Sequence, residues 1–283
     1  MKSIVAAMVV ALLATAPAGA AQYDPEVFVV VPRQPRPGDI VRVTMSLPPG
    51  HEEGRVHFEG KTIPGFVTGG LFNAYIGIDL DMKPGPHEIG FSFGDLRGRR
   101  SVTVKKRTFE SESLSVASKY TDLDAATLER VKKERAALRK VFATITPKRL
   151  WYAAFVKPAE GALGSPFGLR RVFNGQPRSP HAGVDIRAGA GTPVYAANSG
   201  RVAIARNLFF TGNTIVIDHG QGLYTIYAHL SRIDVREGQT VDRSARIGAV
   251  GATGRVTGPH LHWAAKLAGA RVDPATLPGS PLS

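Results

Sequence analysis

Two histidines, His260 and His262, lie two residues apart in the stretch Thr257–Ala265. In an extended strand, residues i and i+2 point to the same face, with their backbones roughly 7 Å apart. One imidazole can then bind a metal ion while the other reaches a substrate or a water beside that ion. Taken alone, the pair is equally compatible with two hydrogen-bonded histidines in an ordinary strand.

A second pair, His181 and Asp185, offers a neutral nitrogen and a hard oxygen at a spacing of four. The intervening Ala-Gly-Val favours a turn that enters a strand over a helix. A catalytic zinc site uses three protein ligands of this mixed kind and leaves one position open for water. Because the chain has no cysteine, any zinc must be held by His, Asp or Glu. This pair is a weak signal that gains weight only from the histidines downstream.

Further histidines differ in their surroundings. His229 closes the predicted strand Tyr224–Leu230, on the same face as Tyr227 by the alternation of a strand, and is expected beside the metal. His219 stands at a strand-to-turn corner, where we expect it to bond to the backbone, although its role stays open. Three more are isolated among turn and strand residues and are expected to be incidental: His51, His57 and His87.

The downstream histidines require a sheet to hold them. From residue 150 onward, short β runs alternate with glycine-rich turns, and the clearest runs are Ser199–Ile204, Asn213–Asp218 and Tyr224–Leu230. Short strands with tight turns and no long helix indicate an antiparallel β domain. We therefore expect an antiparallel β-sheet domain over residues 150–283.

The preceding residues predict two different units. Over residues 21–110, short β runs separated by Pro/Gly turns are typical of an immunoglobulin-like β-sandwich, here an accessory domain. The predicted strands are Val27–Val31, Ile40–Ser46, Arg55–Phe58, Leu71–Ile78, His87–Phe93 and Ser101–Val104. Residues 111–149 form a linker with one α-helix, for which Thr121 and Asp124 fit a capping box with Thr121 as N-cap. The predicted fold class is thus mainly β.

Residues 1–20 have the features of a signal peptide. Lys2 precedes an apolar run over residues 4–14, and Ala18-Gly-Ala20 is a small-residue cleavage site. A mature membrane anchor needs about 20 apolar residues, so no transmembrane segment is expected in the mature chain. The formal net charge of +13 suggests an acidic partner. Export argues against nucleic acid and favours an anionic envelope polymer.

These motifs together resemble the zinc peptidases of the M23 family, the LytM and lysostaphin type of peptidoglycan endopeptidases. The resemblance runs from Gly164 to Pro274, about 110 residues in order. The shared motifs are Ser165-Pro-Phe-Gly-Leu-Arg170, His181-x-x-x-Asp185, Asp218-His-Gly-x-Gly-x-x-Thr-x-Tyr-Ala-His-Leu230, Ile247-Gly-x-x-Gly-x-Thr-Gly254 and Gly258-Pro-His-Leu-His262.

The resemblance implies a role for each site residue. It makes His181, Asp185 and His262 the ligands of one Zn²⁺ per chain, in a LytM-type peptidase domain. It makes His229 and His260 the catalytic pair that orients and deprotonates the water and steadies the tetrahedral oxyanion. No HExxH motif occurs, which excludes a thermolysin-like helix with its glutamate base.

The expected function is therefore that of an exported zinc metalloendopeptidase that hydrolyses the peptide cross-links of peptidoglycan, in the periplasm or cell envelope. The alternative is a catalytically inactive LytM-like module that binds and activates another cell-wall hydrolase. Such modules lose metal ligands, whereas every ligand position and both helper histidines are filled here. The sequence leaves open which cross-link is cut.

Overall fold

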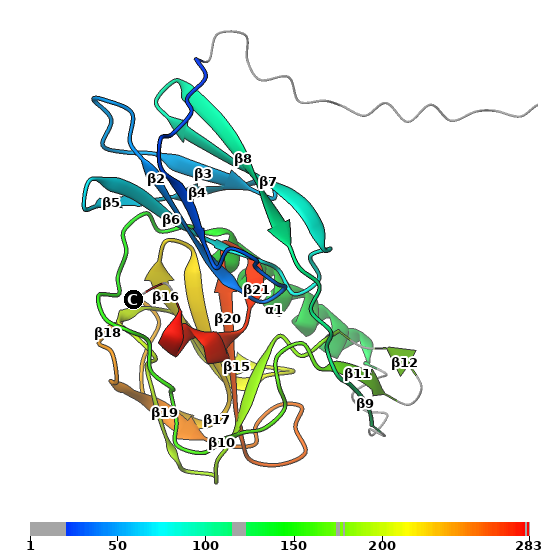
Figure 1. The fold of residues 1–283 in the computed structure, drawn as a ribbon. Helices are drawn as coiled ribbons and strands as arrows, with labels where there is room; N and C mark the ends of the chain where they lie inside the picture. Colours follow the sequence, from blue (N-terminus) through cyan, green and yellow to red (C-terminus); the bar gives the residue numbers. More distant parts are fainter. Residues whose placement is uncertain (1–20, 115–122, 174–175, 178, 281, 283) are drawn as a thin grey trace, which may run out of the picture.

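The fold is mainly β and its sheets are almost entirely antiparallel, which confirms the predicted class (Figure 1). The computed structural model describes residues 21–114, 123–173, 176–177, 179–280 and 282. The predicted signal peptide and Thr121 lie outside these residues. Among the described residues, no helix is both long and apolar enough to cross a membrane.

Two four-stranded sheets form the N-terminal part. One has the order β1 (Phe28–Val31), β2 (Ile40–Ser46), β6 (Leu71–Gly77), β5 (Phe66–Thr68), and the other β4 (Lys61–Pro64), β3 (Arg55–Phe58), β7 (Gly85–Phe93), β8 (Leu96–Val104). Alternate side chains of both sheets share one apolar core, because residues two apart in a strand face the same side. The immunoglobulin-like detail stays a prediction. The short strands β4 and β5 were not predicted.

A ten-stranded sheet forms most of the C-terminal part, and its central path has the order β10-β13-β20-β17-β16-β15-β18. Its strands are β10 (Ala162–Leu163), β13 (Gly183–Arg187), β14 (Pro193–Tyr195), β15 (Gly200–Leu208), β16 (Gly212–Gly220), β17 (Leu223–Ile233), β18 (Thr240–Val241), β19 (Arg246–Val250), β20 (Leu261–Leu267) and β21 (Ala270–Val272). A 3₁₀ helix, Pro274–Gly279, follows.

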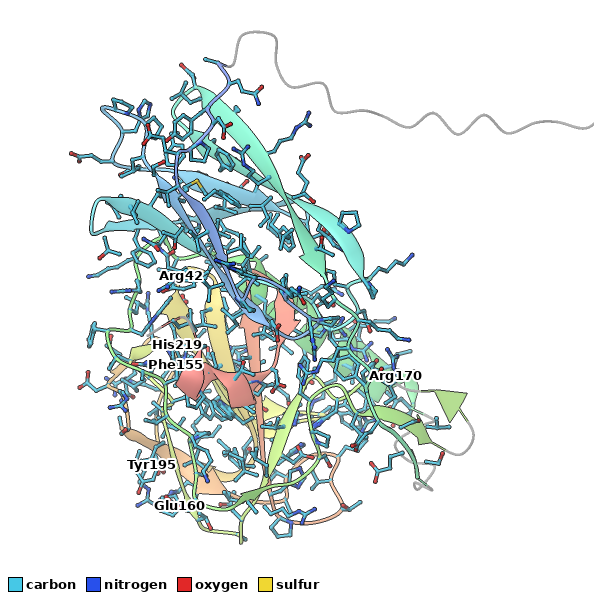
Figure 2. The ribbon with its side chains drawn as sticks, viewed as in Figure 1. Arg42, Phe155, Glu160, Arg170, Tyr195 and His219 are labelled. Atoms are coloured by element: carbon cyan, nitrogen blue, oxygen red, sulfur yellow. The ribbon has the colours of Figure 1, made fainter. Side chains whose placement is uncertain are left out.

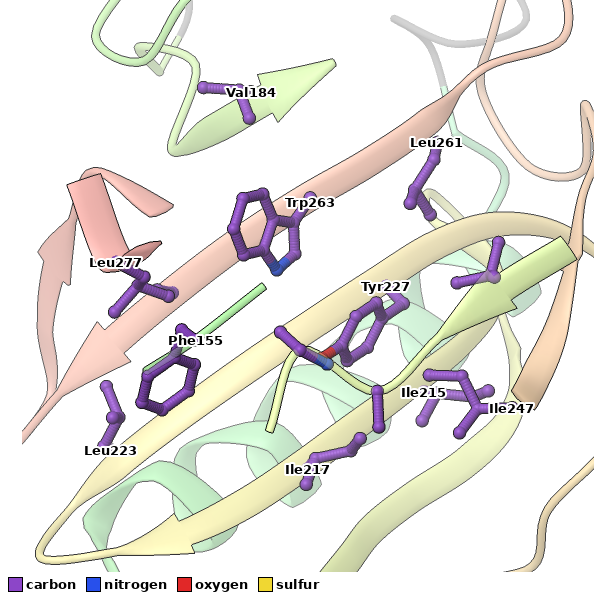
Figure 3. Packing of buried hydrophobic residues seen from close by; sticks show 14 of the residues in the cluster. Phe155, Val184, Ile215, Ile217, Leu223, Tyr227, Ile247, Leu261, Trp263 and Leu277 are labelled. Atoms are coloured by element: carbon purple, nitrogen blue, oxygen red, sulfur yellow. The ribbon is translucent and has the colours of Figure 1, made fainter. Parts of the chain in front are cut away.

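The two faces of this sheet are buried differently. One face carries the main core, in which Tyr227 on β17 lies opposite Trp263 on β20 (Figure 3). The other face is covered by α1 (Ala125–Ala143), whose Phe142 ring meets the edge of Tyr224 at 5.5 Å. On β20, Lys266 is the partner of Tyr224 and lies over the Phe142 ring, on the face that α1 covers. His262, four residues away on the same strand, stands on that face too.

The predicted capping box of α1 is wrong. The helix begins at Ala125, and its N-cap is Asp124, whose carboxylate accepts from the backbone N–H of Thr127 at 2.7 Å. Asp is among the best N-cap residues, and Thr127 also donates its hydroxyl to Asp124 at 3.1 Å. Asp124 therefore caps the helix itself, where the sequence pattern had given it a supporting role.

Segments between the two parts tie them together. Strand β9 (Ser111–Leu114) pairs in parallel with β11 (Arg170–Phe173), which also pairs with β12 (Gln176–Pro177). The ring of Phe109 lies edge-on to Phe167 at 6.2 Å, and Gly168, with φ of +80°, leaves no room for a Cβ beside Phe109. The chain that leaves the N-terminal sheets therefore supports the loop before β13.

A seam of apolar and charged contacts joins the N-terminal sheets to the end of β20 and to β21. Tyr75 belongs to the same core as Trp151, and their rings lie 6.0 Å apart. The guanidinium of Arg271 bonds to Asp79 and to Asp81, and its backbone N–H also donates to Asp79 at 2.9 Å. In Figure 1 the blue-to-cyan sheets form one end of the molecule, and β21 lies in the middle, near the border between these sheets and the C-terminal part.

Replacing Asp79 tests this seam. Burial alone would raise the pKa of Asp79, but the hydrogen bonds from Arg271 outweigh it and keep the carboxylate ionised. Asp79→Ala should lower the free energy of unfolding by about 1–3 kcal/mol, since Arg271 loses its main acceptor. Asp81→Ala is the matched control, because Asp81 is half exposed and its carboxylate is paired, among the described residues, with Arg271. Equal midpoints of urea unfolding for the two variants would contradict this account.

Candidate metal centre

Three side chains converge on one point on the face of the sheet that carries His262. His181 Nε2 lies 3.1 Å from Asp185 Oδ1 and 2.9 Å from His262 Nδ1. His262 Nδ1 lies 3.0 Å from the same Asp185 oxygen. Among the described residues, these three form the group of His, Cys, Asp or Glu side chains able to hold a metal ion.

Strand register produces this convergence. Asp185 on β13 is the direct partner of His262 on β20, so their side chains stand on the same face. His181 precedes β13, and its backbone N–H donates to Leu169 at 2.9 Å. Its ring Nδ1 donates to the carbonyl of Pro166 at 3.0 Å, which leaves Nε2 as the unprotonated nitrogen that faces Asp185.

The donor set fits zinc. Neighbouring ligand atoms of a tetrahedral zinc ion lie roughly 3.3 Å apart, given zinc–ligand distances of about 2.0–2.1 Å. The three atoms here are 2.9–3.1 Å apart. His181 Nε2 and the carboxylate oxygen both carry lone pairs, so their close contact is repulsive unless a cation or a proton lies between them. Carbonyl support of a ligand histidine is also typical of metal sites.

Two further imidazoles lie beside this group. His260 donates Nδ1–H to the carbonyl of Gly258 at 2.9 Å and places Nε2 3.7 Å from Asp185 Oδ1. His229 donates Nδ1–H to the carbonyl of Thr253 at 2.8 Å. The ring of His229 lies 5.0 Å from that of His260 and 6.0 Å from that of His262, between centroids. All five residues singled out from the sequence therefore come together.

The backbone places His229 in a way that simple alternation does not predict. Tyr227 pairs with Trp263 and points into the core, while Ala228 pairs with His262. Strict alternation would put His229 on the face of Tyr227, as the sequence analysis expected. Instead His229 has a left-handed backbone, with φ of +65°, and its ring turns back toward His262. A non-glycine residue in this conformation is strained, and such strain is concentrated at functional sites.

Burial and charge decide the protonation of the group. Burial lowers the pKa of His229 to about 4, and the neighbouring His262 adds to the effect. Burial also lowers the pKa of His262. For Asp185, burial would raise the pKa, but the imidazoles of His181 and His262, which donate to the carboxylate when the facing nitrogen carries a proton, outweigh it and hold the pKa well below its usual range. At neutral pH the centre thus combines an ionised carboxylate with a neutral His229.

His219 lies apart from this group. It is fully buried, and its Nδ1 donates to the carbonyl of Ser199 at 2.7 Å, which confirms the expected bond to the backbone. Its Nε2 lies 2.7 Å from Thr225 Oγ1, and its ring meets Phe155 at 5.1 Å (Figure 2). The other isolated histidines bond within the N-terminal part: His51, His57 and His87.

The residues that sequence reasoning missed act mainly through the backbone. Carbonyls of Pro166, Thr253 and Gly258 fix the Nδ1 nitrogens of three site histidines. Every residue type has a backbone carbonyl, so residue type gives no signal for these positions. All three lie in motifs singled out above, without a role having been assigned to them.

Comparison with known proteins gives consistent results. Residues 179–274 match the family model described as peptidase family M23. A crystal structure described as a putative peptidase M23 from Pseudomonas aeruginosa is similar, with a TM-score of 0.71 and 33% identity, over 87% of this chain and 96% of that one.

Two curated relatives match the C-terminal part. The peptidoglycan DD-endopeptidase ShyA of Vibrio cholerae is 48% identical over 102 residues, which is 36% of this chain and 24% of that protein. The DD-carboxypeptidase/endopeptidase Mpg of Neisseria meningitidis is 40% identical over 115 residues, which is 41% of this chain and 26% of that protein. The chain therefore matches about a quarter of the length of each relative.

The buried His219 predicts how stability depends on pH. Burial lowers its pKa in the folded protein to about 4, below the value of about 6.5 in an unfolded chain. Below pH 6.5 the unfolded chain therefore takes up a proton first, and stability falls until pH 4. Between pH 8 and 4.5, the free energy of unfolding should fall by about 2–3 kcal/mol less in His219→Gln than in the wild type. Urea unfolding with chelator present measures both. Parallel losses would contradict the assignment.

Proposed function

The chain belongs to peptidase family M23, and from this membership we propose that it is an exported zinc metalloendopeptidase that hydrolyses peptide cross-links of peptidoglycan. The observation that carries the proposal is the convergence of one ligand atom each from His181, Asp185 and His262, with the imidazoles of His229 and His260 beside them. The name of the relative ShyA supports peptidoglycan as the substrate, and the names of ShyA and Mpg support cleavage of a DD bond in preference to a glycyl–glycine bridge. Action on peptidoglycan also supports a periplasmic or envelope location.

Each site residue has a proposed role. His181, Asp185 and His262 hold the zinc ion. When bound, zinc lowers the pKa of a coordinated water toward 7 and polarises the scissile carbonyl. His229, whose low pKa keeps it neutral, presents an unprotonated Nε2 that can take a proton from the attacking water. His260, held by Gly258, orients the same water. The protonated His229 then donates to the tetrahedral oxyanion and passes its proton to the leaving amine as the C–N bond breaks.

The proposed division of the chain follows the sequence analysis. A β-sandwich over residues 21–110 is the accessory domain, residues 111–149 are the linker, and residues 150–283 are the peptidase domain. The excess charge supports contact between the later units and an anionic polymer, because residues 123–149 hold eight Lys or Arg against three Asp or Glu. An inactive binding module is not favoured, since such a module has no need of a complete ligand set.

Substitution of the histidines separates metal binding from turnover. His262→Ala should abolish both zinc retention and hydrolysis, because it removes a ligand. His229→Ala and His260→Ala should retain zinc and lose about 10²–10⁴-fold in kcat, the usual contribution of acid–base catalysis. Zinc content by mass spectrometry and cleavage of muropeptides, with and without chelator, measure the two effects. His87→Ala is the control, since His87 lies in the N-terminal sheets. Unchanged hydrolysis by His229→Ala would refute its role.

Product analysis tests the bond that is cut. Digestion of defined muropeptides should release monomers from direct DD cross-links and leave glycyl–glycine bridges intact. Masses of the products identify the bond. Cleavage confined to glycine bridges would contradict the DD assignment while leaving the zinc mechanism in place.

A further inference from the structure

Two side chains of α1 hold the turn between β15 and β16. Arg130 Nε donates to Glu134 Oε1 at 2.7 Å, and the other oxygen of Glu134 accepts from the backbone N–H of Phe209 at 2.9 Å. Arg130 Nη2 donates to Asn207 Oδ1 at 3.0 Å. The Glu134 side chain is only 17% exposed, so its charged hydrogen bonds are shielded from water and correspondingly strong.

The contact continues from this turn toward the metal centre. Asn207 donates its amide to Asn213 Oδ1 at 3.0 Å, and Asn213 donates its own amide to the carbonyl of Leu230 at 3.0 Å. The backbone N–H of Asn213 donates to Thr253 Oγ1 at 2.9 Å, while that hydroxyl donates to Leu230 at 2.8 Å. Asn213 and Thr253 together therefore fix the residue that follows His229.

The last contacts hold His229 itself. Its ring Nδ1 donates to the carbonyl of Thr253, and its backbone N–H donates to the carbonyl of Thr211 at 2.9 Å. The β15–β16 turn and the loop after β19 are in backbone contact at Gly212 and Gly254. A Cβ on Gly212 would lie 2.3 Å from Thr253, and one on Gly254 would lie 2.4 Å from Gly212. A strained left-handed residue persists only when its surroundings fix it in this way.

From these contacts we propose that α1 positions His229 through a continuous chain of hydrogen bonds, with Arg130, Glu134, Asn207, Asn213 and Thr253 as positioning residues. The inference rests on the proposed catalytic role of His229. It extends the working site to a helix that lies outside the matched peptidase segment, residues 179–274.

The physical consequence concerns turnover more than binding. With Nδ1–H fixed on Thr253, Nε2 of His229 faces the centre at a set position. A displacement of about 1 Å in a catalytic group can cost on the order of 10²-fold in rate. The zinc ligands lie outside this chain of bonds, since His181, Asp185 and His262 are placed by β13, β20 and the loop before β13. Loosening α1 should therefore lower kcat while zinc content and KM stay unchanged.

The test compares Glu134→Ala with Glu129→Ala in the full-length, zinc-loaded protein. Glu129 lies on the same helix but is exposed, and within the described part of the chain its carboxylate forms one ion pair, with Lys132 at 3.9 Å. Glu134→Ala should lower kcat on muropeptides about tenfold, the lower end of what loss of a supporting partner costs, and Glu129→Ala should not. Glu134→Gln should recover only part of the rate, because its amide oxygen still accepts from Phe209 but its amide nitrogen cannot accept from Arg130.

A nuclear magnetic resonance measurement supplies a readout independent of activity. The Nδ1–H signal of His229, identified by its loss in His229→Gln, should exchange with solvent faster in Glu134→Ala than in Glu129→Ala. Asn207→Ala breaks the same series of hydrogen bonds one step further on and should have the same effect. It replaces Glu134→Ala in the test if that variant does not fold. Wild-type values of kcat and exchange in both Glu134→Ala and Asn207→Ala overturn the inference. A wild type that cleaves no muropeptide overturns the proposed function, and the exchange rates then still decide whether α1 holds His229.

Discussion

Three atoms that carry lone pairs, one from the loop before β13, one from β13 and one from β20, are held within 3.1 Å of one another, and the rest of the structure depends on this contact. Their mutual repulsion is relieved when a cation lies between them, so folding of the surrounding sheet prepares a place for a metal. The pairing of β13 with β20 sets Asp185 against His262. The loop before β13 adds His181, whose tautomer is fixed by a backbone carbonyl.

The two faces of the ten-stranded sheet have different roles: one packs the apolar core, and the other carries the candidate metal centre. Trp263 and Tyr227 fill the core on one face, and the neighbouring His262 stands on the other. His229 would belong to the core face if β17 kept its alternation. Its left-handed backbone moves the ring to the chemical face, and the hairpin and loop around it hold that strained conformation. Local strain at this residue is thus the means by which a fourth histidine reaches the centre.

The sequence predicted regular strands and the grouping of site residues well. Strands Ile40–Ser46 and Arg55–Phe58 have the predicted bounds, because alternation and flanking turns mark them clearly. The short β4 and β5 escaped prediction, since strands of three or four residues form only through pairing with neighbours. The N-cap of α1 was misplaced, because Asp124 serves equally well as cap or as supporting residue of a capping box. The conformation of His229 depends on hydrogen bonds from two distant loops, which no local pattern contains. Ligand and catalytic roles remain predictions.

The measurement that tests the central claim most directly is zinc K-edge X-ray absorption of the protein loaded with one equivalent of zinc. The account predicts one tightly bound ion per chain, with four nitrogen or oxygen neighbours and the outer-shell scattering of two imidazoles. Scattering from four imidazoles would contradict it, because His229 and His260 would then be ligands. A protein that retains no zinc would contradict the claim that His181, Asp185 and His262 form a zinc site.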